Sequence, residues 1–330
     1  MALTGLKEDA LKLILFGGKG GVGKTTCALS AGLYLAKEGF KTLVISTDPA
    51  HSLADSLGQK IGDEIHPVKN VKISREKGKI SNRVKEVGDI KNLSALEVSA
   101  QKALSQFKVK YEVQIKKIFA TSSYLDQEDM DSFFALPIPG IDEVMGFKTI
   151  VDIIEEAEFD KCIVDTAPTG HALRLLTLPE LLDEWIKVIA KMRWKYRYMV
   201  ETFSGKYNPD EGDDFLLEMK KTVKRIAGLL KDQSKCEFIA VTIPEAMAIL
   251  ETERLVNDLN SYGIKVKQLL LNNVLESKDC QFCRERSNAQ EDYLQQVRKK
   301  FSNLQLTILP LQPREVKGIE ALDKFAERLF

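Results

Sequence analysis

Short apolar runs and helical stripes alternate along the chain. The runs are bounded by turn-forming or polar residues, and their length is typical of buried strands in a parallel sheet. They lie at residues 11–16, 41–47, 161–164, 236–244 and 265–274, and a last one begins near residue 306. Segments with helical spacing, such as residues 251–263, separate them. We therefore predict an α/β fold with a mostly parallel, doubly wound sheet.

Two long stretches carry helical stripes that do not fit as connections within a sheet. The first begins at Leu96 and continues through Phe107 and Tyr111 to Ile118. The second covers residues 181–199 and 215–230. We predict helical insertions at residues 96–135 and 181–235, and a nucleotide-binding core formed by residues 1–95, 136–180 and 236–330. Residues 58–93 are polar and rich in Lys and Glu, and no chemistry is assigned to them.

A glycine-rich loop follows the first apolar run. Gly18, Gly23, Lys24 and Thr25 satisfy the phosphate-loop pattern GxxxxGK[ST]. Backbone N–H groups of such a loop surround phosphates, Lys24 reaches the β- and γ-phosphates, and the Thr25 hydroxyl ligates Mg²⁺. An isolated match occurs by chance, but the strand before it and the helix after it favour nucleotide binding over a bland turn. The residues expected to contact ATP here are Gly20, Gly21, Val22, Gly23, Lys24, Thr25 and Thr26.

Lys19 is a second lysine within the same loop. A loop that already has Lys24 gains little from another cation, unless that cation serves a different nucleotide. We therefore interpret Lys19 as directed at the nucleotide of a partner subunit.

Two further strand ends carry acids. Asp48, Ser52 and Asp55 follow the second run, where ligands of open α/β sheets bind; capping of a helix is an equally good reading of these residues taken alone. Asp165 follows the run at 161–164, where phosphate-loop nucleotidases place an acid that holds Mg²⁺ through water. Gly170 offers a backbone that can approach a γ-phosphate closely.

Composition excludes several classes of partner. Lys plus Arg and Asp plus Glu both number 48 of 330 residues, so no global field recruits nucleic acid or an anionic membrane, and such a partner requires a local patch. No apolar stretch is long enough to cross a membrane, and no secretory signal is recognised. We expect a soluble, cytoplasmic protein.

The five cysteines argue against a disulfide framework because their number is odd. Cys27, Cys162 and Cys236 lie in apolar segments and are expected in the core. Cys280 and Cys283 form a CxxC. A structural zinc needs four ligands, so two subunits would each donate one pair; the alternative is a redox pair, which usually opens a helix in a βαβ unit. The absence of such a pattern from the sequence favours zinc.

Together these motifs resemble the arsenite-pump ATPase family, whose phosphate loop is a deviant Walker A motif. The resemblance spans nearly the whole chain and is closest to the single-copy homodimeric branch that targets tail-anchored membrane proteins. It rests on the sequences GGKGGVGKTT, DPAHSLADSLG, PGIDE, DTAPTGHALRLLTLP, ETERL, LNN and CxxC.

The resemblance implies roles for individual residues. Lys19 is similar to the lysine that crosses the dimer interface to the other subunit's phosphates, Asp55 to the acid that polarises the attacking water, and Asp165 to the second switch acid near Mg²⁺. Further matches are Glu245 at a nucleotide-contacting position, Asn272 at the adenine-reading position, Pro313 in the loop that covers the base, and Cys280 with Cys283 as ligands of a zinc shared across the dimer.

The function implied by the resemblance is an ATP-hydrolysing homodimer that binds the transmembrane helix of client proteins and delivers them to a membrane receptor. The alternative is the catalytic ATPase of an arsenite or antimonite efflux pump, although that branch usually carries two ATPase halves and cysteines in its helical region. A third hypothesis is a nucleotide-gated scaffold with negligible turnover. The segment KMRWKYRYMV departs from a Met-rich client-binding helix because basic residues stand among its aromatics.

Overall fold

The computed structural model divides the chain into two compact units. A core unit comprises Met1–Ser99, Ile153–Leu173 and Leu230–Phe330, and a helical unit comprises Ala100–Asp152 and Arg174–Leu229. The boundaries predicted from the sequence, at residues 96, 136, 181 and 236, divide the chain at other positions than these two units do, and they remain predictions. The structure describes residues 3–48, 52–75, 82–122, 141–166, 183, 186–187, 190–191, 193–195, 197–277 and 279–330. Gly170 lies outside them.

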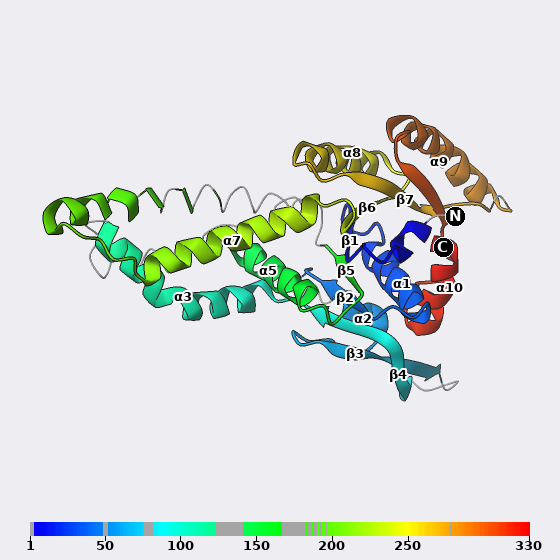
Figure 1. The fold of residues 1–330 in the computed structure, drawn as a ribbon. Helices are drawn as coiled ribbons and strands as arrows, with labels where there is room; N and C mark the ends of the chain where they lie inside the picture. Colours follow the sequence, from blue (N-terminus) through cyan, green and yellow to red (C-terminus); the bar gives the residue numbers. More distant parts are fainter. Residues whose placement is uncertain are drawn as a thin grey trace. The chain divides into compact units, whose positions relative to one another are not determined.

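An eight-stranded sheet with the order β3-β4-β2-β5-β1-β6-β7-β8 forms the centre of the core unit (Figure 1). All neighbouring pairs are parallel except β3 with β4, so the predicted α/β fold with a mostly parallel sheet is confirmed. The strands are β1 (Leu13–Gly17), β2 (Thr42–Ser46), β3 (His66–Arg75), β4 (Asn82–Glu97), β5 (Lys161–Asp165), β6 (Cys236–Thr242), β7 (Val266–Val274) and β8 (Gln305–Pro310).

The antiparallel pair β3–β4 occupies the polar stretch in which the sequence analysis predicted no strand. Its Lys- and Glu-rich composition hides the strands, because an edge pair need not be apolar on both faces. The prediction that a helix begins at Leu96 is wrong: Leu96 belongs to β4 and pairs with Ile45 of β2. The helix α3 (Ala100–Ser122) starts only after this pairing ends.

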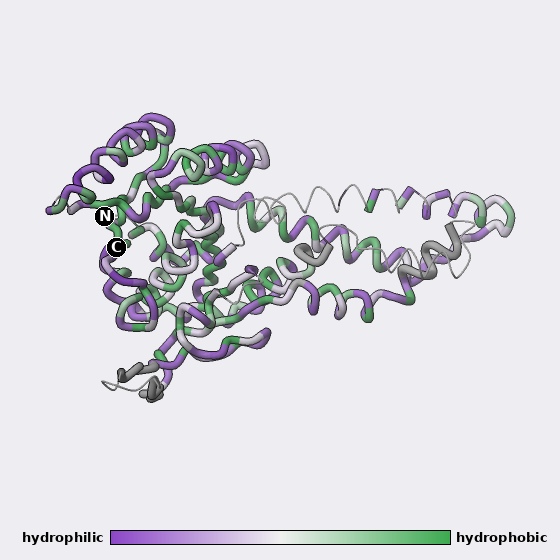
Figure 2. Tube along the Cα trace, turned by 180° about the vertical axis from the view of Figure 1, so that it is seen from behind, coloured by the Kyte–Doolittle hydropathy of each residue, from purple (hydrophilic) through white to green (hydrophobic). Residues whose placement is uncertain are grey.

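Helices cover the sheet with their apolar faces. α1 (Lys24–Lys37) packs against α10 (Ile319–Leu329), while α8 (Ala246–Ser261) contacts β6 and β7. The short α2 (Ser52–Leu57) packs on α1, and α9 (Gln281–Lys300) contacts α8. Figure 2 shows mostly hydrophobic residues along the central strands and mostly hydrophilic ones along α9.

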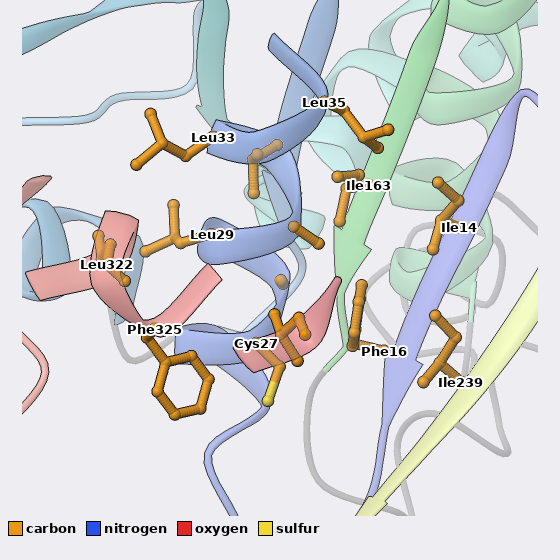
Figure 3. Close-up of a cluster of buried hydrophobic side chains, with 14 of the residues drawn as sticks. Ile14, Phe16, Cys27, Leu29, Leu33, Leu35, Ile163, Ile239, Leu322 and Phe325 are labelled. Carbon is orange, nitrogen blue, oxygen red and sulfur yellow. The ribbon is translucent and has the colours of Figure 1, made fainter. Parts of the chain in front are cut away.

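The hydrophobic core lies between α1, α10 and the central strands. Figure 3 shows the strands that carry Phe16 and Ile163 on one side of α1, and Leu29 of α1 extending from the other side toward Leu322 and Phe325 of α10. The expected burial of the cysteines is confirmed, since Cys27, Cys162 and Cys236 are all buried. Burial raises the pKa of the Cys162 thiol to about 12, so it stays protonated and inert near neutral pH.

The helical unit is built around α3, α5 (Ile141–Glu155, whose last turn belongs to the core unit) and α7 (Glu211–Lys231). Phe107 and Tyr111 of α3 pack with Phe215 of α7, with ring centroids 5.0–6.1 Å apart. The Tyr111 hydroxyl donates a hydrogen bond to Glu218. The predicted stripe from Phe215 to Leu230 is buried, which confirms it as packing surface. None of the described helices is both long and apolar enough to cross a membrane.

Candidate nucleotide site

The phosphate loop joins the buried strand β1 to the first turn of α1. Two of its glycines are required by close neighbours. A Cβ on Gly18 would lie 2.1 Å from the backbone oxygen of Val241, and Gly23 has a φ of +93° with Asn272 Nδ2 2.4 Å from where its Cβ would be. The backbone of Val241 leaves no room for a side chain at position 18, and the positive φ at position 23 strains any residue other than glycine. The helix that follows directs its free N–H groups into the loop.

Lys24 lies inside the loop rather than in solvent. Its side chain is 6% exposed, and Nζ donates to the backbone oxygen of Lys19 at 3.1 Å. Burial lowers the pKa of Lys24, while the charges of Asp165 and Asp48 act in the opposite direction. A desolvated ammonium that donates to one carbonyl within the described residues is ready to pair with a phosphate group.

Asp165 at the end of β5 connects the loop to the start of α2, in the segment that follows β2. Its Oδ2 accepts a hydrogen bond from the Thr25 hydroxyl at 2.6 Å and one from the Ser52 hydroxyl at 3.3 Å. Burial, only partly offset by these hydrogen bonds and by Lys24, raises the pKa of Asp165 from 3.8 to about 6. Its Oδ1 is buried without a hydrogen-bond partner in the described part of the chain.

This arrangement fits the Mg²⁺ that a phosphate-loop ATPase uses. Mg²⁺ prefers oxygen ligands and keeps several of its waters. The Thr25 hydroxyl offers a direct ligand, and the unpaired Oδ1 of Asp165 offers an acceptor for a metal-bound water. A nearby divalent cation would also offset the burial of this carboxylate. The sequence-predicted pair Thr25 and Asp165 is thus brought together.

The segment after β2 is fixed to the same site, but Asp55 is not. Asp48 N donates to the Ser46 hydroxyl at 3.1 Å, and Thr47 N donates to the backbone oxygen of Asp165 at 3.1 Å. Asp55 is exposed on α2, and within the described residues no hydrogen bond or ion pair joins it to the phosphate loop. Its role as the residue that polarises water remains a prediction.

Asn272, predicted to read the adenine, contacts the phosphate loop. It is 5% exposed at the end of β7, and its Nδ2 donates to the backbone oxygen of Val22 at 2.9 Å. Its Oδ1 has no partner among the described groups. Glu245 is exposed at the start of α8, and Pro313 is exposed between β8 and α10.

Lys19 forms an ion pair within its own chain. Its Nζ lies 3.7 Å from Oε1 of Glu251 on α8, and both side chains are about one-third exposed, at 34% and 27%. An ion pair at this exposure is weak. Lys19 is therefore held against α8 only weakly, and breaking its ion pair with Glu251 costs little free energy.

Cys280 and Cys283 lie at the surface with their sulfurs 3.0 Å apart. Cys280 caps α9 and accepts a hydrogen bond from the Cys283 N–H at 3.2 Å. Hydrogen bonds from Cys283 lower the pKa of the Cys280 thiol. The sequence argument against a redox pair is wrong in one respect, because the CxxC does open the helix of a β7–α9–β8 unit with parallel strands. Within the described residues, no cluster of three or more metal-ligating side chains occurs.

Two residues that sequence reasoning missed support the site. Glu97 at the end of β4 accepts a hydrogen bond from Ala54 N at 3.1 Å and so fixes α2. Glu251 pairs with Lys19. Glu97 was hidden because β4 was not recognised, whereas Glu251 stands in the ETERL motif without any local sign of its partner.

A phosphate loop at the end of β1, a buried lysine and a threonine–aspartate pair define the class of protein as a phosphate-loop nucleotide-binding α/β protein. Comparison with known families narrows this class. The chain belongs to the anion-transporting ATPase (ArsA) family, whose model matches residues 11–330.

Curated relatives cover almost the same length. The protein "ATPase ASNA1 homolog 1" of Paramecium tetraurelia is 34% identical over 98% of this chain and 94% of its own length. A relative named "ATPase get3", from Botryotinia fuckeliana, is 31% identical over 98% of this chain and 91% of its own length. Family membership and the site together make the chain an ATP-hydrolysing enzyme that uses ATP and Mg²⁺.

The environment of Asp165 predicts an effect on stability. In the protein free of Mg²⁺, the folded state holds the Asp165 proton more tightly than the unfolded chain does. Stability from this group therefore falls as pH rises from about 4 to about 6. Asp165→Asn should raise the free energy of unfolding at pH 7.5 by about 2–3 kcal/mol, and the gain should vanish towards pH 4.

Urea unfolding at both pH values measures this effect, and Asp160→Asn is the matched control because Asp160 stands exposed at the other end of β5. The same Asp165→Asn variant should lose Mg²⁺-dependent ATP hydrolysis. An Asp165→Asn variant that is no more stable than the wild type at pH 7.5 would contradict the account.

Proposed function

We propose that the protein is a homodimeric targeting ATPase that binds the transmembrane helix of tail-anchored clients and delivers them to a membrane receptor. The observation that carries the proposal is the match, over 98% of the chain, to relatives named ASNA1 and Get3. These names belong to the targeting branch of the family rather than to the arsenite-pump branch. The role places the protein in the cytoplasm.

The chemistry of hydrolysis follows from the site. Phosphoryl transfer requires positioning and charge neutralisation more than covalent chemistry. Lys24 would pair with the terminal phosphates, and Thr25 and Asp165 would hold Mg²⁺, which would neutralise the charge of the phosphates. Asp55 orients the attacking water once the segment that carries α2 closes on the γ-phosphate. Asn272 reads the adenine through its free Oδ1, while Pro313 and Glu245 approach the nucleotide from the surface.

Lys19 completes the site of the other subunit. A cation supplied by a second chain stabilises the charge of the transition state as an arginine finger does. For this, Lys19 must leave Glu251, and the exposure of both side chains makes that exchange inexpensive. ATP then binds most tightly where two chains meet, and hydrolysis releases them.

The helical unit supplies the client surface. On α3, Val109 and Val113 are 79% and 66% exposed and stand one turn apart. Exposed apolar side chains at this spacing are suited to contact an apolar helix. The same helix carries Phe107 and Tyr111 on its packed side, so its fold does not depend on the exposed face.

The pump alternative is the weaker hypothesis. A metalloid site needs thiolate ligands. The chain has no cysteine within either segment of the helical unit, and Cys27, Cys162 and Cys236 are buried in the core unit.

The client proposal predicts a soluble complex on co-expression with a protein that bears one C-terminal transmembrane helix. Val109→Asp/Val113→Asp should reduce the recovered complex severalfold, because charge is placed on the apolar face. Ile65→Asp is the matched control, since Ile65 is 38% exposed but belongs to the core unit. Failure to recover any complex, together with stimulation of ATP hydrolysis by antimonite, would overturn the targeting function in favour of the pump.

The zinc proposal concerns the pair Cys280, which is exposed, and Cys283, which is partly exposed. Each chain offers two of the four ligands that a structural zinc needs, and the exposure of the pair leaves room for the other chain's pair. We expect about one zinc per two chains. Metal analysis of the purified dimer measures this ratio, with Cys280→Ser/Cys283→Ser as the zinc-free control. A dimer without zinc but with a Cys280–Cys283 disulfide would favour the redox alternative.

A further inference from the structure

The segment at residues 190–206 of the helical unit presents aromatic side chains to solvent. Trp194 and Tyr198 are 64% and 63% exposed, and Phe203 is 84% exposed. The rings of Trp194 and Tyr198 are one turn apart and stacked, with centroids separated by 6.0 Å. Large aromatic side chains seldom remain this exposed without a partner surface.

The opposite side of this segment is fixed to the start of α7. Arg193 is only 3% exposed and forms ion pairs with Asp210 and, at 3.3 Å, with Asp213. Its guanidinium also lies 5.6 Å from the ring centre of Tyr207. These contacts determine which side of the segment faces inward, and they leave Trp194 and Tyr198 on the outward side.

Two lysines share the outward side with the aromatics. At 100° per residue, Lys191 and Lys195 stand within about 60° of Tyr198 around the helix axis. Both are exposed, and in the described part of the chain neither has an acidic partner. By contrast, Arg197 is neutralised by Glu201 at 2.9 Å. The face therefore combines aromatic rings with unpaired positive charge.

We propose that this face, defined by Lys191, Trp194, Lys195 and Tyr198, docks on a membrane surface that contains anionic phospholipid. Indole and phenol rings are suited to the depth of lipid headgroups, and neighbouring lysines pair with anionic headgroups. An apolar client helix would leave both ammonium groups without a counterion. The chain has equal numbers of acidic and basic residues, so its net charge does not attract an anionic membrane. Contact with such a membrane requires a local basic patch, and this face provides one.

The inference goes beyond the targeting function because it concerns the protein without client or receptor. Docking on the lipid surface holds the helical unit at the membrane before any receptor is met. The attraction is electrostatic in part, so it weakens as salt rises.

Flotation of the client-free protein with vesicles tests the proposal. The protein should float with vesicles of phosphatidylcholine and phosphatidylserine at a ratio of about seven to three, and not with phosphatidylcholine alone. Lys191→Glu/Lys195→Glu should weaken binding about tenfold or more. The matched control is Lys220→Glu/Lys221→Glu, which makes the same charge change at exposed lysines of α7. Equal loss in the control, equal binding to neutral vesicles, or no binding would overturn the proposal.

Tryptophan fluorescence gives a second measurement that does not depend on the charge variants. The chain has two tryptophans, so Trp185→Phe leaves Trp194 as the reporter. Its emission should shift to shorter wavelength when the mixed vesicles are added, because the indole enters the headgroup region. An unchanged emission would contradict the proposal. If the wild type binds no vesicles and Trp194→Ala/Tyr198→Ala loses client capture, the face belongs to the client instead.

Discussion

The buried carboxylate of Asp165 is the constraint on which the rest of the site depends. It lies at the end of β5, between the loop after β1 and the segment after β2, and it accepts hydrogen bonds from Thr25 and Ser52 on those two segments. Burial raises its pKa to about 6, so the site is destabilised when empty and charged. A bound Mg²⁺ would offset that charge and would thereby couple nucleotide binding to the positions of both loops.

The ion pair between Lys19 and Glu251 bears on how the site is completed. Within one chain the lysine pairs with α8, whereas the proposed mechanism requires it at the phosphates of another chain. Because the pair is partly exposed, breaking it costs the chain little free energy. The bound nucleotide therefore determines whether Lys19 lies at Glu251 or at the phosphates of the other chain. Under the proposed mechanism, bound ATP would hold the two chains of a dimer together.

Local motifs were readable from the sequence, whereas contacts between distant segments were not. The phosphate loop, the strand that ends at Asp165 and the buried cysteines are encoded in short patterns, and all were predicted. The strands β3 and β4 were missed because an edge pair can be polar, and Leu96 was assigned to a helix because its pairing with Ile45 is non-local. The contacts Lys19–Glu251 and Asn272–Val22 join residues more than two hundred positions apart, so they cannot be predicted from a local sequence pattern.

The central claim is that each site is completed by the lysine of the other chain, and mixing two inactive variants tests it directly. Lys19→Ala and Asp55→Asn should each lose ATP hydrolysis as homodimers while still binding ATP. In a mixed dimer, the chain with Lys19→Ala keeps its own Asp55 and receives Lys19 from its partner. Random pairing should therefore restore about one quarter of wild-type activity, since half of the dimers carry one complete site of two. Activity that stays at the level of the separate variants would place Lys19 in its own chain's site and contradict the account.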